Sequence, residues 1–146
     1  MRDPEAAAAK LAEAEQPVHV PLSRDTRALN ARIRAECHQL VKFLATHAWD
    51  DAASVTHDPE ALWTPSAIES EGMAYEERQG GPPDATPRAR RPHLTLIEPD
   101  GKLRWRIRHT LLDAEGEIAG YLEGVVDLSE DQDPVGPVLQ LERLAD

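Results

Sequence analysis

Two long stretches in the second half of the chain alternate between apolar and polar residues. The first, 102–112, alternates tryptophan, isoleucine and leucine with arginine, and the second, 118–128, places glycines and aliphatic residues on every other position. A period of two residues is the pattern of a β-strand with one buried face. The segment 113–117, which contains Gly116, joins the two and is typical of a hairpin turn. The pattern therefore predicts an antiparallel ribbon with one apolar side.

The side chains of this ribbon also predict its register. If the apolar residues face inward, Arg104, Arg106 and Arg108 face solvent, and a slip of one residue would bury all three. Matching the two faces places Arg108 opposite Glu123 and Arg104 opposite Asp127. Such cross-strand pairs contribute about 0.2–1 kcal/mol each. We therefore expect a row of paired arginines on the outer face of the sheet.

The inner face of the ribbon contains one polar side chain, His109. It is either a pocket histidine that acts as a base or contacts a ligand, or a core histidine hydrogen-bonded to a neighbour, the interpretation we favour. The glycines on this face leave space for a bulky neighbour, a bend or a pocket. The predicted inner set is Leu103, Trp105, Ile107, His109, Leu111, Ile118, Gly120, Leu122, Gly124, Val126 and Leu128.

The first half of the chain is predicted to be helical. From Asp25 or Thr26 to Ala48, apolar residues recur every three or four positions, and Cys37 lies among them as a small buried hydrophobe. Most basic residues of this helix fall largely on the other face, at Arg27, Arg34, His38 and Lys42. A short helix is expected over 50–56.

A third helix has clear start and stop signals. Thr64 is a suitable N-cap and Pro65 suits the first helical position. The helix is predicted to end at Gln79, before the glycine and proline residues of 80–83. Tyr75 lies on its inner side, and we expect its hydroxyl at the rim of the core.

Two further strands, over 93–98 and 137–144, complete the predicted fold. The order of elements predicts an α+β fold, with the N-terminal helices packed on one face of a curved, four-stranded antiparallel sheet. Residues 1–22 are interpreted as an N-terminal arm or linker and residues 23–146 as a single domain. A chain of 146 residues buries roughly 68 % of its unfolded surface, enough for a core without disulfides.

Charge is distributed unevenly along the chain. The whole chain has 16 basic and 27 acidic residues, a net charge of −11, whereas the segment 88–108 has seven basic and two acidic residues, a net charge of +5. Such a segment either contacts phosphates or is neutralised by neighbouring acids. The candidate contacts to a nucleic acid or partner are Arg88, Arg90, Arg91, Arg104, Arg106 and Arg108.

Motifs that would indicate a cofactor or a catalytic centre are missing from the sequence. There is no phosphate-binding GxxxxGK[ST] or GxGxxG loop and no GxSxG nucleophile motif. The six histidines and the single cysteine form no metal-ligand spacing. No apolar run is long enough to span a membrane, and the acidic start does not fit a signal peptide. We therefore predict a cytoplasmic protein with no catalytic residue, no cofactor, no metal and no membrane contact.

The region from Leu62 onward resembles the C-terminal domain of unknown function found in bacterial DEAD/DEAH-box helicase-like proteins. Residues 26–56 resemble it in pattern only, so the similarity covers about 120 residues. The sequence departs from the family at His109, where glutamine is expected, and near Tyr121, where tryptophan is expected. Neither a phosphate loop nor a DEAD motif is present, so the resemblance concerns the accessory domain and not the helicase motor. The matching blocks are 84–92, 105–113, 115–116 and 122–129.

The order of helices and strands is also similar to the cone-shaped fold of nuclear transport factor two and the steroid isomerases. Together the resemblances imply a non-catalytic accessory domain that contacts a helicase or a nucleic acid. The alternatives are a small-molecule pocket protein or isomerase-like enzyme, and a structural domain that forms a homodimer. The pocket of the first alternative would be lined by Trp63, Tyr75, Trp105 and His109. Architecture alone does not decide among these functions.

Overall fold

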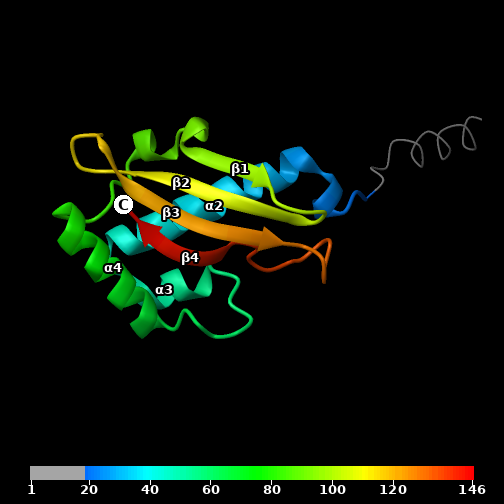
Figure 1. Cartoon of the computed structure of the whole chain (residues 1–146), viewed down its shortest axis with the longest axis horizontal. Coiled ribbons are helices and arrows are strands. Elements are labelled where there is room, and N and C mark those ends of the chain that lie inside the picture. Colours follow the sequence, from blue (N-terminus) through cyan, green and yellow to red (C-terminus); the bar gives the residue numbers. More distant parts are fainter. Residues whose placement is uncertain (1–18) are drawn as a thin grey trace, which may run out of the picture.

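The computed structural model describes residues 19–146, in which helices come first and a sheet follows. Figure 1 shows α2 running behind the sheet, with α3 and α4 below it and the front of the sheet uncovered. This arrangement confirms the predicted α+β class, with three helices followed by a four-stranded antiparallel sheet. The elements are η1 (Leu22–Arg24), α2 (Thr26–Ala45), α3 (Trp49–Ser54), α4 (Pro65–Gln79), η2 (Pro87–Arg90), η3 (Pro92–Leu94), β1 (Thr95–Pro99), β2 (Arg104–Leu112), β3 (Ile118–Asp127) and β4 (Gln140–Ala145).

The ends of the helices follow from local chemistry. The side chain of Asp25 accepts a hydrogen bond from the amide of Ala28 at the start of α2. Thr64 caps α4 in the same way, Pro65 occupies its first turn, and Gly80 ends it in a left-handed conformation with φ = 83°. The predicted bounds of α4 are therefore confirmed, whereas α2 ends at Ala45, three residues before the predicted end.

The sheet has the strand order β1-β2-β3-β4, and every neighbouring pair is antiparallel. The predicted register is confirmed, because Arg108 lies opposite Glu123 and Arg104 lies opposite Asp127. Three predicted strands begin too early. His93 and Leu94 belong to the 3-10 helix η3, which starts at a proline; β2 begins at Arg104; and residues 137–139 precede β4. The third strand, in turn, ends one residue before Leu128.

The prediction that Ile118 faces inward is wrong. The pairing of β2 with β3 is irregular between Thr110 and Leu112, so the alternation changes near the hairpin. As a result Ile118 is 64 % exposed, and its neighbour Ala119 is buried. The carbonyl of Ala119 accepts a hydrogen bond from the Tyr75 hydroxyl, which joins the hairpin to α4. The hydroxyl of Tyr75 is thus buried and not at the rim, because it has this backbone partner.

The inner-face glycines are occupied by neighbours. At Gly120, where φ is +87°, a Cβ atom would lie 2.4 Å from the carbonyl oxygen of Ala145 and 3.3 Å from the Tyr75 ring. At Gly124 it would lie 2.9 Å from Leu139. The glycines therefore allow the backbone of Gln140 and Ala145, and the side chains of Tyr75 and Leu139, to approach β3 closely. Cys37 is fully buried in the same core, as predicted, and burial, reinforced by Glu36, raises its pKa to about 12.

A buried carboxylate attaches the segment before β4 to α2. Oε1 of Glu36 accepts hydrogen bonds of 2.9 Å from the amides of both Val138 and Leu139. Arg32, one turn earlier, lies 3.4 Å from the other Glu36 oxygen and donates to the carbonyls of Pro134, Val135 and Gly136. Because a loop with unsatisfied buried amides is costly, this pair fixes the path of the chain into the last strand.

Candidate interaction surfaces

The first candidate surface is the outer face of the sheet, where the β2 arginines project into solvent. Their side chains are between 48 % and 62 % exposed. Arg104 and Arg106 both lie near Asp100, at 3.7 and 3.6 Å. Asp127, opposite Arg104, instead accepts hydrogen bonds from Ser129. The first two arginines of the row therefore share one carboxylate in the preceding turn.

The third arginine of the row belongs to a ladder across three strands. Glu123 of β3 lies 3.6 Å from Arg108 of β2 and 3.2 Å from Arg143 of β4. The guanidinium of Arg108 also lies over the ring of Tyr121, 4.4 Å from its centre, which is cation–π geometry. Every arginine on this face thus has an acidic neighbour. Paired guanidiniums release few counterions when a polyanion approaches, so this face is poorly suited to phosphate binding.

The arginines before β1 divide into two groups. Arg88 is held at the hairpin, because its guanidinium binds Asp84 at 2.9 Å and donates to the carbonyl of Ala114. Arg90 and Arg91 are exposed and have no acidic group within 4.0 Å among residues 19–146. The six predicted contact residues therefore do not form one patch of equivalent groups.

His109 lies in the core, 1 % exposed, between the sheet and α2. Its Nδ1 atom is 2.8 Å from the hydroxyl of Thr95, and its ring stands edge-on to that of His38 with 5.6 Å between centres. Burial, followed by the charge of His38, lowers the pKa of His109 to about 4. It is a neutral core histidine with a side-chain partner at pH 7.

The other predicted pocket residues have internal partners too. The indole of Trp63 donates to the carbonyl of Leu141 at the β4 strand, and the hydroxyl of Tyr75 binds the β3 backbone. Trp105 is half-buried and packs against the core beside the strands. Tyr75 borders a cleft of about 450 Å³ between the end of α4 and the β2–β3 hairpin, but Trp63, Trp105 and His109 do not line it. The four residues are therefore not gathered around one cavity.

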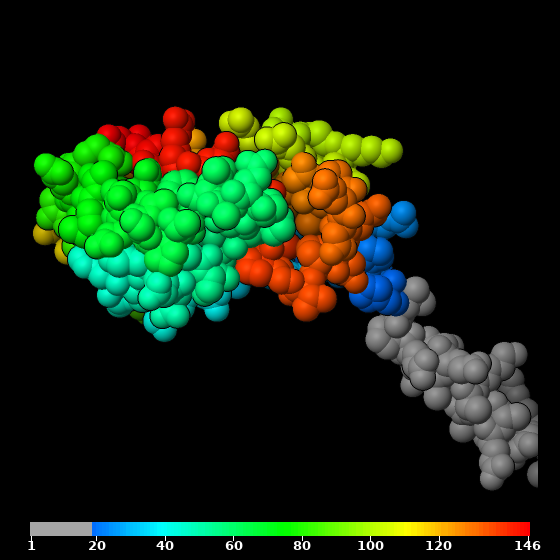
Figure 2. Space-filling view, turned by 90° about the horizontal axis from the view of Figure 1, so that it is seen from below, coloured from blue at the N-terminus to red at the C-terminus, as the bar shows by residue number. Residues whose placement is uncertain are grey.

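A second hollow lies between the chain after α3 and the chain after β3. Figure 2 shows it between the teal and orange segments, and it has a volume of about 340 Å³. Its lining includes His57, Glu60 and Asp127.

Within residues 19–146, no group of three histidine, cysteine or acidic side chains is arranged to hold a metal ion. In the same part of the chain, no helix has the length and apolar character that crossing a membrane requires.

The sequence prediction gave no role to His38, which lies on α2 opposite His109. Its Nε2 atom is buried without a hydrogen-bond partner in the described part of the chain. Burial, followed by the charges of Arg90 and Arg34, lowers the pKa of His38. The spacing of Arg34, His38 and Lys42 on one helix is visible in the sequence, but the closeness of Arg90 to His38 depends on the tertiary fold.

Comparison with known proteins assigns the chain to a family. A family described as a domain of unknown function, DUF3516, matches residues 1–144, and the chain belongs to it. Comparison with curated proteins gives no match, and comparison with solved structures gives none either.

Proposed function

We propose that this member of the DUF3516 family is a non-catalytic interaction domain that works with a DEAD/DEAH-box helicase. The contact surface in this proposal is the outer face of the sheet, centred on Arg104, Arg106 and Arg108. The observation that carries it is that this face of the sheet is uncovered (Figure 1) and that its arginine side chains are exposed. Arginine is enriched at protein interfaces, where its fork binds carboxylates and its stem packs on apolar surface.

A protein suits this face better than a polyanion does. The ladder of Arg108, Glu123 and Arg143 presents both signs of charge side by side, and complementary charge patterns direct partner choice and speed of association. Leu96, 50 % exposed on the edge strand beside Arg108, adds an apolar contact. A mixed face with a central arginine row thus favours a protein partner.

The alternative of a small-molecule pocket has less support. The polar groups of Trp63, Tyr75 and His109 are engaged with other parts of the chain. A ligand would have to displace these hydrogen bonds before it could use the same atoms. The similar order of elements in the nuclear transport factor two fold is an analogy of architecture, and it gives no chemical support to the small-molecule alternative.

The test is direct binding between the purified chain and a purified DEAD-box helicase from the same organism. We expect the double variant Arg104→Glu/Arg108→Glu to weaken association by about tenfold or more, since each reversal places like charge against the partner. The variant Arg27→Glu/Lys42→Glu changes net charge equally but lies on α2, so it serves as the matched control. Equal affinities for all three proteins would contradict the proposal. Light scattering of the chain alone at several concentrations tests the alternative that this domain forms a homodimer.

A further inference from the structure

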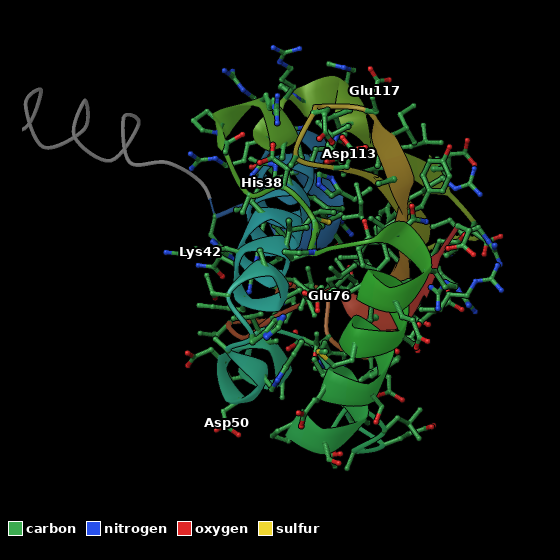
Figure 3. The ribbon with its side chains drawn as sticks, turned by 90° about the vertical axis from the view of Figure 1, so that its left-hand side faces the viewer. His38, Lys42, Asp50, Glu76, Asp113 and Glu117 are labelled. Atoms are coloured by element: carbon green, nitrogen blue, oxygen red, sulfur yellow. The ribbon has the colours of Figure 1, made fainter. Side chains whose placement is uncertain are left out.

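One flank of the α2 helix is lined by basic residues. Arg27, Arg34, His38 and Lys42 are seven, four and four residues apart, which places them within one narrow stripe of a helix with 3.6 residues per turn. At a rise of 1.5 Å per residue, the stripe is about 22 Å long. Figure 3 shows Lys42 on the side of α2 that faces away from α4. The stripe therefore forms an extended line of basic groups, exposed at Arg27 and Lys42 and partly buried at Arg34 and His38.

The 3-10 helix η2 adds a fifth basic group from a distant part of the sequence. Arg90 is exposed, and its charge acts on His38 together with that of Arg34. Because η2 packs against α2, Arg90 lies beside this part of the helix, although it is more than fifty residues from Arg34 and His38 along the chain. We call the set Arg27, Arg34, His38, Lys42 and Arg90 the α2–η2 stripe.

Among the described residues, the arginines and the lysine of the α2–η2 stripe differ from the arginines of the sheet in having no acidic partner. Within residues 19–146, no carboxylate lies within 4.0 Å of the charged groups of Arg27, Arg34, Lys42 or Arg90, whereas all four arginines on the outer sheet face have one. The one acidic residue of α2, Glu36, is buried on another side and binds Arg32. In a chain with net charge −11, cations gathered without acids are available to an external anion.

We propose that the α2–η2 stripe binds the phosphate backbone of a nucleic acid, without reading its base sequence. A single phosphate group is too small to contact both ends of a line about 22 Å long, whereas one strand of a duplex places about six phosphates along that length. Arginine and lysine are the side chains that contact phosphates most directly. The stripe thus matches a polyanion in length and in chemistry.

A membrane surface fits the stripe less well. Helices that bind in the plane of a membrane place large apolar residues beside their basic ones. In α2 the large apolar residues are turned into the core, and none is among the exposed hydrophobic residues of the described chain. We therefore assign the stripe to nucleic acid and treat binding to anionic vesicles as a contrary outcome.

The proposal goes beyond the helicase contact, which uses a different face, so the two can fail separately. The probes are a labelled single-stranded RNA and a labelled DNA duplex of about 20 units each, long enough to cover the stripe. Four phosphate contacts to a single strand predict that affinity falls about 50-fold between 50 and 200 mM salt. The measurement is fluorescence anisotropy across that range of salt.

Two triple variants with equal net charge locate the contact. Arg34→Gln/Lys42→Gln/Arg90→Gln removes three charges from the stripe, and Arg104→Gln/Arg106→Gln/Arg108→Gln removes three from the sheet. We expect the stripe variant to lose most of its binding and about two units of the salt slope, and the sheet variant to bind like the unmodified chain. Circular dichroism melting checks that both remain folded.

Three outcomes would overturn the assignment: no binding of either probe at the lowest salt, equal losses in both variants, or binding to anionic vesicles alone. A chain that binds the helicase but no nucleic acid would contradict this inference and leave the proposed function standing. A chain that binds nucleic acid through the stripe but binds no helicase would contradict the proposed function and leave this inference standing.

Discussion

The two faces of the sheet use polar side chains in opposite ways. On the side that faces α2 the polar groups are few and buried, and Glu36, Tyr75 and His109 each have a hydrogen-bond partner inside the fold. On the open side the polar groups are many and exposed, and Arg108 and Glu123 remain in contact with water. A buried polar group is costly to leave unpaired, so the face that packs on α2 should determine the stability of the fold. An exposed ion pair contributes little to stability, so the open face should matter mainly for binding a partner.

The largest effect should come from removing the buried carboxylate of α2. Glu36→Ala leaves the amides of Val138 and Leu139 without an acceptor and Arg32 without its ion pair. Breaking a buried pair by removing one partner costs about 3–5 kcal/mol. Urea denaturation followed by circular dichroism should show a loss of that size in the free energy of unfolding.

The matched control is Glu142→Ala on β4, where the carboxylate is exposed. Surface substitutions of this kind usually change stability by less than about 0.5 kcal/mol. Equal losses for Glu36→Ala and Glu142→Ala would mean that the two sides of the sheet do not differ as we describe.

Local signals predicted most of the fold. The Thr64–Pro65 start and the Gly80 stop of α4 are short-range chemistry, and the arginine alternation of β2 specified the register with β3. The exposure of Ile118 was not predictable from the same pattern, because it depends on a pairing irregularity at the hairpin. Irregularities of this kind are set by packing between strands, which a period of two residues does not reveal.

The site was less predictable than the fold, because charged side chains choose partners in three dimensions. Register alone suggested Asp127 as the partner of Arg104, yet the structure places Arg104 near Asp100. The basic row on β2 was conspicuous in the sequence, whereas the closeness of Arg90 to His38 arises only when η2 packs beside α2. The sequence shows which segments are rich in basic residues. Only the positions of the acidic side chains in the fold show which of these basic residues lack an acidic partner among the described residues.

The second effect in size concerns the buried histidine and depends on pH. The pKa of His109 is lowered from 6.5 to about 4 by burial and by His38, so the unfolded chain takes up a proton at a higher pH than the folded chain does. His109 therefore has little effect on the free energy of unfolding above pH 6.5, and it lowers this free energy as the pH drops toward 4. This histidine alone should lower the free energy of unfolding by about 3 kcal/mol at pH 4.

The measurement is a series of denaturant titrations between pH 7 and pH 4 on the unmodified chain and on His109→Gln. The amide of glutamine retains a hydrogen-bonding group for Thr95 but does not titrate in this range. We expect the variant to lose less stability than the unmodified chain as pH falls. Identical pH profiles would show that His109 does not titrate differently in the folded and unfolded states.

The smallest effect should come from the outer ladder. Arg108→Ala removes a guanidinium that is 53 % exposed, its 3.6 Å contact with Glu123 and its place over Tyr121. Exposed ion pairs contribute about 0.2–1 kcal/mol, and salt screens them. A double-mutant cycle with Glu123→Ala, measured at low and high salt, should give a coupling energy below about 1 kcal/mol that decreases with salt. A coupling energy of several kcal/mol would instead mean that this ladder stabilises the fold. The contrast between a stabilising inner face and a binding outer face would then be wrong.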